Sequence, residues 1–472
     1  MEPTEPLAVV TTVGDSTRHV RLFGTHQFFR LWLAQVVSSL GDWLGFLAIT
    51  VLAIRVGEGS EGSAVGLVMT ARIVPGFFLG PLAGVLVDRW DRKKVMVACD
   101  LARAVVLCFL PFVDTVFGLV VASLLMEVFT LLWSPAKEAS VPNLVPPDRL
   151  ASSNSLSLGA AYGSLPIASV LFAVLASAQE GLDVDALRMG QEGTLALYAD
   201  ALTFTVSALL IASLTLGPAA KTATETETAA GFRDTVRQFR EGWSFIFVNP
   251  VVRAVNVGLA TGLIGGGMVV PLGAEFSKDV LGAGAAGYGV FVTCLGLGAA
   301  AGIVLVSLTQ RHLPRDTVFP VAVFGAAVFL AGAASFSTLG PAAACVVGFG
   351  VCAGTAYVVG FTLLHEHVDD ELRGRIFSAI YVLVRLCLLI AFAVGPFLSG
   401  ALDGLSADRF GDRRVELPGG GELFLPGVRL TLWAGALIIF VAAVLALLSL
   451  RAEHLRQRLA DARAARLAAG EG

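Results

Sequence analysis

The sequence predicts an all-α polytopic membrane protein with twelve transmembrane helices in two six-helix, pseudo-symmetric halves. Three observations support this. Hydrophobic residues make up 56% of the 472 residues and charged residues 15%, against about 45–50% and about 25% in soluble domains. The chain contains twelve apolar runs of roughly 20 residues, the length that crosses a bilayer. A short, dense knot of charge separates two of these runs without interrupting the pattern.

The twelve apolar runs are joined mostly by short connections. The 52 glycines fit this class of protein, because glycine is tolerated in membrane helices and lets their backbones approach closely. We place the spans at 30–54, 64–87, 95–116, 118–138, 150–177, 194–216, 251–274, 286–308, 317–338, 341–364, 375–402 and 429–450.

The charged knot follows an apolar helix in which Gly80 and Gly84 stand one turn apart, a spacing that favours close helix packing. From Asp88 to Lys94 six of seven residues are charged, and the sequence is apolar again from Val95. In a membrane protein this pattern indicates a tight cytoplasmic turn between two spanning helices.

Lys and Arg are concentrated in alternate connections, and this bias places both termini in the cytoplasm. The linker between the halves contains an amphipathic helix, which either lies on the inner membrane face or packs on the cytoplasmic ends of the bundle. We predict an N-terminal segment 1–29, an N-terminal six-helix half 30–216, a cytoplasmic linker 217–250, a C-terminal half 251–450 and a basic cytoplasmic tail 451–472.

A weak internal repeat supports the division into halves. Gly80 and Gly302, and likewise Asp148 and Asp370, are separated by 222 residues. Two halves related by a parallel repeat are typical of transporters, which carry a substrate site between the halves. The last outside loop, 403–428, alternates around a glycine turn and predicts a small hairpin.

Charges inside membrane spans are costly, so each is a candidate for function. Asp42 and Glu127 lie near the middle of their spans, Arg72 lies in the outer half of its span and Arg385 roughly mid-span. All four are candidates for proton coupling or substrate binding. A buried carboxylate such as Glu127 could exchange a proton during transport, and Asp42 could instead pair with Arg72.

Three further charges within spans are weaker candidates. Asp100 and Arg103 stand one helical turn apart and could simply neutralise each other. Asp200 lies nearer the outer end of its span. We interpret the first two mainly as a structural pair.

The charged turn, Gly84-Val-Leu-Val-Asp88-Arg89-Trp-Asp91-Arg92-Lys93, resembles the Gly-x-x-x-Asp-Arg-x-Gly-Arg-Lys/Arg signature of the major facilitator superfamily, with Asp91 at the usual glycine. The segments 29–43 and 141–146 resemble the subgroup that contains macrolide and siderophore exporters. The resemblance covers nearly the whole chain and implies the major facilitator fold. It also implies a gating role for the signature loop, in residues Gly80, Gly84, Asp88, Arg89, Arg92 and Lys93, although topogenic charge alone would explain the Lys and Arg.

From these features we expect a secondary active transporter that exports a hydrophobic or amphipathic small molecule (drug, macrolide or siderophore-like) by alternating access and proton antiport. A central cavity would be lined partly by the aromatic residues Trp43, Phe46, Tyr162 and Tyr381. The alternatives are a lipid flippase or uptake transporter on the same fold, or a non-transporting membrane module that binds a protein partner.

The expected partners are the small-molecule substrate, protons and membrane lipids, for a monomer in the cell membrane. We expect neither enzymatic activity nor nucleic-acid binding, and no cofactor. We also expect no metal, because the suggestive sequence His365-Glu366-His367 falls at the inner end of a span and reads as an ordinary exposed loop.

Overall fold

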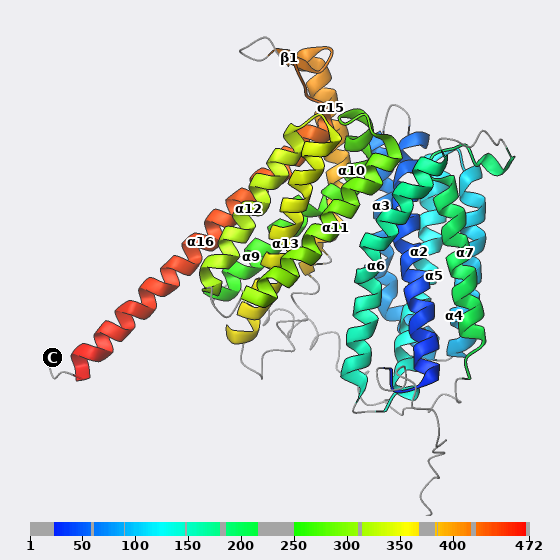
Figure 1. Ribbon diagram of the computed structural model, residues 1–472, viewed down its shortest axis with the longest axis horizontal. Coiled ribbons are helices and arrows are strands. Elements are labelled where there is room, and N and C mark those ends of the chain that lie inside the picture. Colours follow the sequence, from blue (N-terminus) through cyan, green and yellow to red (C-terminus); the bar gives the residue numbers. More distant parts are fainter. Residues whose placement is uncertain are drawn as a thin grey trace, which may run out of the picture.

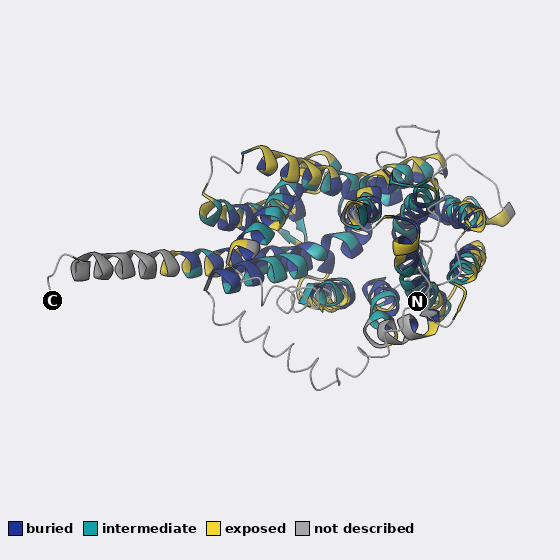
Figure 2. Cartoon of the chain, turned by 90° about the horizontal axis from the view of Figure 1, so that it is seen from below, coloured by how far each residue is buried: buried dark blue, intermediate teal, exposed yellow. Residues whose placement is uncertain are grey.

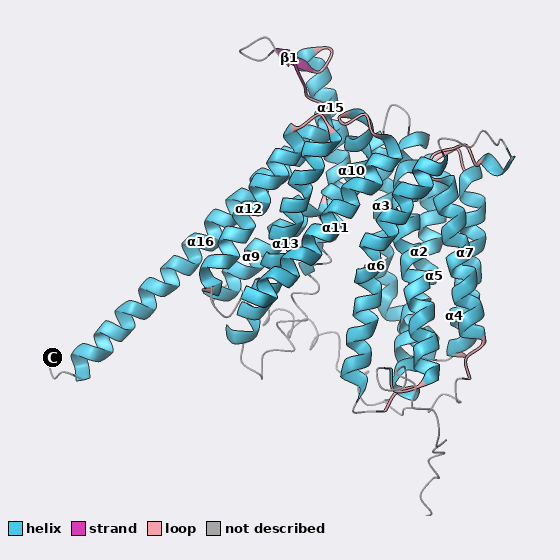
Figure 3. Cartoon of the chain, in the orientation of Figure 1, coloured by secondary structure: helices cyan, strands magenta, loops and turns pink. Residues whose placement is uncertain are grey.

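The computed structural model describes residues 23–57, 61–88, 90–146, 149–179, 186–215, 250–309, 314–367, 383–384, 386–416 and 422–468. The predicted linker, apart from Pro250, and most of the predicted N-terminal segment lie outside these residues. The described chain is helical except for its connections and one small hairpin (Figure 3).

Six long helices form the N-terminal half. Each matches one predicted span, with ends that differ by a few residues. They are α2 (His26–Val56), α3 (Glu61–Asp88), α4 (Arg92–Phe109), α5 (Val116–Ser140), α6 (Leu150–Gln179) and α7 (Thr194–Ala212), with short 3₁₀ turns at Leu110–Phe112, Val141–Asn143 and Ala186–Arg188.

The C-terminal half repeats this arrangement with two interrupted helices. It contains α9 (Pro250–Gly267), α10 (Val269–Asp279), α11 (Gly284–Thr309), α12 (Arg315–Ser335), α13 (Leu339–His367), the π-helix η5 (Ile390–Val394), α15 (Gly395–Phe410) and α16 (Gly427–Ala468). The predicted hairpin is confirmed: β1 (Arg414–Glu416) and β2 (Glu422–Phe424) pair antiparallel, with Val415 opposite Leu423.

Side-chain caps explain where several helices begin. The Thr25 hydroxyl accepts a hydrogen bond from the Phe28 amide at the start of α2, and Thr115 does the same for Gly118 at the start of α5. Such caps satisfy amide groups that have no partner inside the helix. The α9–α10 break at Met268 has a related cause, because Pro271 has no amide hydrogen to donate to the carbonyl of residue 267.

The starts of corresponding helices confirm the two-fold repeat. Helices α3 and α11 begin at Glu61 and Gly284, 223 residues apart, and α4 and α12 begin at Arg92 and Arg315 with the same spacing. Helices α5 and α13 repeat that spacing, from 116 to 339. The two halves therefore share one helical plan.

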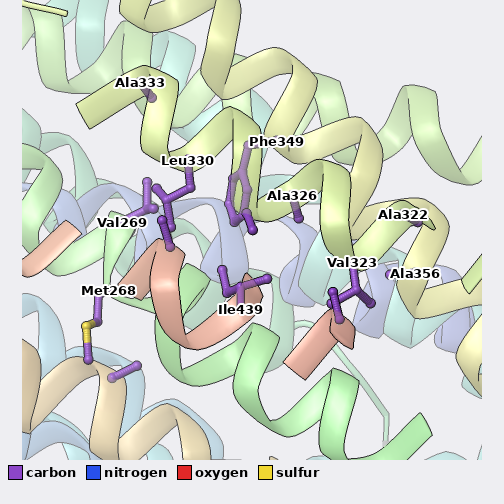
Figure 4. Close-up of a cluster of buried hydrophobic side chains, with 14 of the residues drawn as sticks. Met268, Val269, Ala322, Val323, Ala326, Leu330, Ala333, Phe349, Ala356 and Ile439 are labelled. Carbon is purple, nitrogen blue, oxygen red and sulfur yellow. The ribbon is translucent and has the colours of Figure 1, made fainter. Parts of the chain in front are cut away.

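Each half has its own hydrophobic core. Buried positions lie toward the inside of the bundle and exposed positions mostly on its outside (Figure 2). The C-terminal core joins α10, α12, α13 and α16 through residues such as Val269, Leu330, Phe349 and Ile439 (Figure 4). Close packing of this kind gives each half a defined shape.

The outside of the helical bundle is strongly apolar. Phe117 is 77% exposed, Leu308 74% and Phe109 66%, and they are part of a long series of large exposed apolar side chains. A soluble monomer rarely carries such a surface. Eleven helices among the described residues are long and apolar enough to cross a membrane, and the 28-residue apolar helix α3 is the twelfth. The chain is a multi-pass membrane protein.

The bundle has two distinct ends. We call the end that carries β1 and β2 the hairpin end, and the end where α2 begins and α16 finishes the termini end (Figure 1). The halves meet toward the hairpin end and diverge toward the termini end (Figure 1). Glycines make the contact close: a Cβ on Gly62 would overlap the carbonyl of Pro396, and one on Gly289 would overlap the backbone of Ala173.

Two helix ends differ from prediction. Helix α13 continues through His367, so the sequence His365-Glu366-His367 lies on a helix, where Glu366 forms an ion pair with Arg315 of α12. The predicted inner loop was therefore wrong at these residues. Helix α16 continues to Ala468, far beyond the predicted span end at 450, because its last turns are rich in Ala, Leu and Arg, which are good helix formers.

Candidate functional site

A cavity of about 280 Å³ lies where the two halves meet. Its walls are mostly apolar, with one cation and one carboxylate among them. The lining residues are Arg72, Ile73 and Gly76 of α3, Glu127 and Leu131 of α5, and Leu388 and Phe392 of the C-terminal half. Two residues that the sequence separated by 55 positions and two helices therefore share one cavity.

Arg72 is held against an aromatic group. Its guanidinium carbon lies 5.6 Å from the centroid of the Phe46 ring, within the range of a cation–π contact. Phe46 in turn lies 5.7 Å from Phe392 and 6.0 Å from Trp43, measured between ring centroids. The Nη1 atom of Arg72 is buried and has no hydrogen-bond partner among the described residues. Arg72 thus offers the cavity a cation with a donor to spare.

Glu127 contributes the opposite charge to the same cavity. Gly76 of α3 faces it, and a Cβ at Gly76 would lie 3.7 Å from Glu127 Oε1. A glycine here keeps the wall beside the carboxylate open. A cation and a carboxylate among apolar side chains suit an amphipathic molecule that carries its own charged or polar groups.

A second polar cluster lies inside the N-terminal half, around Arg103 of α4. Arg103 forms an ion pair with Asp100, and its Nη1 lies 3.7 Å from Asp42 Oδ1. The Ser207 hydroxyl of α7 donates to Asp100 Oδ2 at 2.7 Å. The predicted Asp100–Arg103 pair is confirmed, whereas Asp42 has Arg103 as its ion-pair partner rather than the expected Arg72.

Arg103 is almost completely buried. It is 1% exposed, Asp100 0%, and the Asp42 side chain 34%. The Arg103 guanidinium lies 4.1 Å from the centroid of Phe204 and 5.6 Å from that of Trp133. A buried charge needs such partners. Asp42, on the edge of the cluster, keeps an accessible surface.

A larger groove of about 570 Å³ runs between α2 and α6. It is lined by Trp32, Val36, Leu40, Ser152, Leu156, Gly159, Ala160, Gly163, Ser164 and Ile167. A Cβ on Gly159 or Gly163 would meet nothing within 4 Å. Because α2 and α6 also contact α10 and α11, this groove belongs to the face that the N-terminal half turns toward its partner half.

The signature loop is organised by capping. Asp91 accepts a hydrogen bond from the Lys94 amide and caps α4, which gives a physical reason for an acid where the signature has glycine. Arg92 donates to the carbonyl of Ala139 and Lys93 to that of Leu214, both at 2.7 Å. These carbonyls end helices of the same half, where cations are favoured.

The other signature residues are described less fully. Gly80, Gly84 and Asp88 lie on α3, and Asp88 is its last residue. Arg89 lies outside the described residues. A gating role for this loop therefore remains a prediction.

Of the four predicted cavity aromatics, two can be placed. Phe46 contacts both Arg72 and Phe392, and Trp43 donates to the carbonyl of Ala161 at 3.0 Å. Tyr162 lies on α6, with its side chain outside the described part of the chain. Tyr381 and Arg385 also lie outside the described residues.

The sequence reasoning missed several residues of the site. Leu388 and Phe392 line the cavity from an apolar run that gives no signal of function. Glu275, 7% exposed, accepts a hydrogen bond from Ser399 at 2.8 Å and looked like a helix end. Its position inside a span, four residues before Asp279, was the available signal. Among the described residues no three His, Cys, Asp or Glu side chains could hold a metal ion.

Twelve apolar helices in two repeated halves, with a polar cavity between them, define a membrane transporter rather than an enzyme. The family profile described as Major Facilitator Superfamily matches residues 31–391. The chain belongs to that family.

Two curated relatives extend this finding. An uncharacterized MFS-type transporter of Bacillus subtilis (strain 168), YkuC, is 26% identical over 379 residues, covering 75% of this chain and 81% of the relative. Macrolide efflux protein A of Streptococcus pyogenes is 24% identical over 397 residues, covering 82% and 90%.

The fold is also similar to a solved structure. A bacterial homolog of the human lysosomal transporter Spinster, in an inward-facing and unoccupied conformation, aligns with a TM-score of 0.68. It shares 16% sequence identity, and the alignment covers 90% of this chain and 98% of that one. At this identity the likeness concerns the fold.

Proposed function

We propose that the protein exports a hydrophobic or amphipathic small molecule, of drug, macrolide or siderophore-like character, across the cell membrane by alternating access and proton antiport. The observation that carries this proposal is the cavity between the halves, with Arg72 and Glu127 set among apolar side chains. An amphipathic substrate would bury its apolar part against Leu131, Leu388 and Phe392 and direct its polar groups to the two charges.

The groove between α2 and α6 supports the same substrate class. Its walls are apolar or small, so a large molecule would be bound there by burial rather than by a fixed pattern of hydrogen bonds. Export is supported by the similarity to a protein named for macrolide efflux. The fold alone would serve either direction.

The orientation follows from charge. The signature loop with Arg92, Lys93 and Lys94 lies at the termini end, so the positive-inside rule places that end, with both termini, in the cytoplasm. The divergence of the halves toward the termini end then corresponds to an inward-open state (Figure 1). Glu61 and Lys278, which pair across the halves at the hairpin end, would close the outer side.

Inverted membrane vesicles loaded to an acidic lumen test this function, with labelled erythromycin as the probe. We expect the imposed proton gradient to drive accumulation, and a protonophore to abolish it. A charged hydrogen-bond partner contributes about 1.5–3 kcal/mol, so Arg72→Gln and Glu127→Gln should each weaken probe binding by about tenfold or more.

Glu138→Gln is the matched control, because Glu138 is an exposed carboxylate on the same helix as Glu127. Its transport should equal that of the unchanged protein. If both Glu127→Gln and Asp42→Asn leave gradient-driven accumulation unchanged, those two carboxylates do not couple transport to protons. Lipid translocation by reconstituted protein without probe transport would favour the flippase alternative.

A further inference from the structure

A third carboxylate of the N-terminal half, Asp200 of α7, is completely buried. It is 0% exposed. Its Oδ1 accepts a hydrogen bond of 3.3 Å from the Thr203 hydroxyl, one turn along the same helix. Its Oδ2 is also buried and has no hydrogen-bond partner among the described residues. An ionised carboxylate in this position would leave one oxygen without compensation.

Two glycines of α2 make room for this side chain. A Cβ on Gly41 would overlap both Asp200 Oδ1 and the Thr203 hydroxyl, and a Cβ on Gly45 would overlap Asp200 Oδ2. The carboxyl group therefore lies directly against the backbone of α2. Glycine is required at both positions because the two helices approach closely there.

Four charged groups face Asp200 from the helices packed around it. They are Asp42 of α2, Arg72 of α3, and Asp100 and Arg103 of α4. Helix α6 carries no ionisable residue between Leu150 and Gln179, nor does the 3₁₀ turn at Leu110–Phe112. Both cations are engaged elsewhere: Arg103 with Asp100 and Asp42, and Arg72 with Phe46.

The charges in this region do not balance if every group is ionised. Asp42, Asp100 and Asp200 carry three negative charges, and Arg72 and Arg103 carry two positive ones. An unpaired charge in a membrane interior is strongly unfavourable. Of the three carboxylates, Asp100 is bonded to Arg103 and Asp42 keeps an accessible surface. The carboxylate with neither is Asp200.

We propose that Asp200 is the proton-binding site of this transporter. The proposal rests on the proton antiport proposed above and changes the residue that carries the proton. In the described state Oδ2 holds the proton as a neutral carboxylic acid. When the proton leaves to water, the O–H bond breaks, and the resulting carboxylate must gain a hydrogen-bond donor in place of the α2 backbone.

Helix α2 connects this site to the substrate cavity. Gly45, which packs on Asp200, directly precedes Phe46, and Phe46 contacts Arg72 in the cavity wall and Phe392 across the halves. Loss of the proton from Asp200 would loosen the contact of α7 with α2 and so shift Phe46. Substrate binding next to Arg72 would act on the same helix from the other side.

Infrared difference spectroscopy of the reconstituted protein tests the proton site without relying on transport. Cycling the pH should produce a carboxylic-acid C=O band that is absent in Asp200→Asn and present in Asp42→Asn and Glu127→Gln. Thr203→Val, which removes the donor to Oδ1, should keep the band at a shifted frequency. A band that survives in Asp200→Asn would overturn the assignment.

A second measurement separates this proposal from the proposed function. Erythromycin added to weakly buffered purified protein should release protons, and Asp200→Asn should abolish that release while still binding the probe. If Asp200→Asn releases protons normally, the Asp200 site is wrong and antiport stands. If the band belongs to Asp200 but a proton gradient drives no transport, antiport is wrong and the proton site stands. Asp200→Asn is close to isosteric, and monodisperse elution verifies its folding.

Discussion

Glu61 and Lys278 form an ion pair that joins the two halves: Glu61 begins α3, Lys278 lies near the end of α10, and 2.9 Å separates Oε1 from Nζ. The pair lies at the hairpin end, beside the close contact of Gly62 with Pro396. The side chains are 27% and 49% exposed. Such a pair contributes about 0.2–1 kcal/mol in water.

Loss of this pair should favour opening of the hairpin end. We expect Lys278→Glu to raise the population of open molecules by a few-fold, because two like charges would then face each other. Electron-paramagnetic-resonance distances between spin labels on α3 and α10 measure that population. The exchange variant Glu61→Lys with Lys278→Glu should return it to the original value. An unchanged distance distribution in the single variant would contradict a closing role for the pair.

Removal of Arg103 should destabilise the N-terminal half severely. Breaking a buried ion pair by deleting one partner costs about 3–5 kcal/mol, because the other charge is left without compensation. Arg103→Met should therefore lower the midpoint of thermal unfolding, measured by tryptophan fluorescence in detergent. The double variant Asp100→Val with Arg103→Ala should recover much of that loss. Val323 and Ala326, 223 residues further on, occupy the corresponding positions of α12 in a purely apolar core (Figure 4).

Substitution of Gly45 should be poorly tolerated. A Cβ there would overlap the Asp200 carboxyl group, and overpacking a tight interior costs about 1–3 kcal/mol. Gly45→Ala should lower thermal stability and transport together. Gly163→Ala is the matched control, because its Cβ would meet nothing within 4 Å. Equal losses in the two variants would show that helix packing against Asp200 is not the cause.

The connection between α4 and α5 should respond only to acid. Arg188 donates to Asp114 Oδ1 at 2.5 Å and lowers the pKa of that carboxyl. A lowered pKa in the folded state stabilises the protein above the unfolded value, about 3.9, and the effect is lost as the pH falls through the folded pKa. The stability difference between the unchanged protein and Arg188→Gln should be present at neutral pH and vanish in strong acid. A difference that persists in strong acid would assign the effect to Arg188 contacts other than the Asp114 charge.

Much of the fold follows from local patterns. Apolar runs of membrane-spanning length correspond to all twelve long helices, and the Asp100–Arg103 pair follows from residues one turn apart. The hairpin follows from alternation around a glycine turn. These features depend on residues close together in the chain, so a single sequence contains the information.

The site depends on contacts between distant segments. Arg72 and Glu127 were each suspicious as charges in spans, but their common cavity follows only from the packing of α3 beside α5. Phe392 and Leu388 look like any lipid-facing residue. Asp200 seemed a weaker candidate because of its position along the helix. Its environment depends on Gly41 and Gly45, two glycines in a sequence that contains 52.

The unequal interiors of the two halves have an electrical consequence. The residues 223 positions after Asp100, Arg103 and Glu127 are Val323, Ala326 and Gly350, all uncharged. A membrane potential does about 2.3 kcal/mol of work per 100 mV on each elementary charge that crosses it. At this depth the potential therefore acts on the N-terminal half and leaves its counterpart in the C-terminal half unaffected. Voltage sensitivity of transport would then arise in the six helices before the linker.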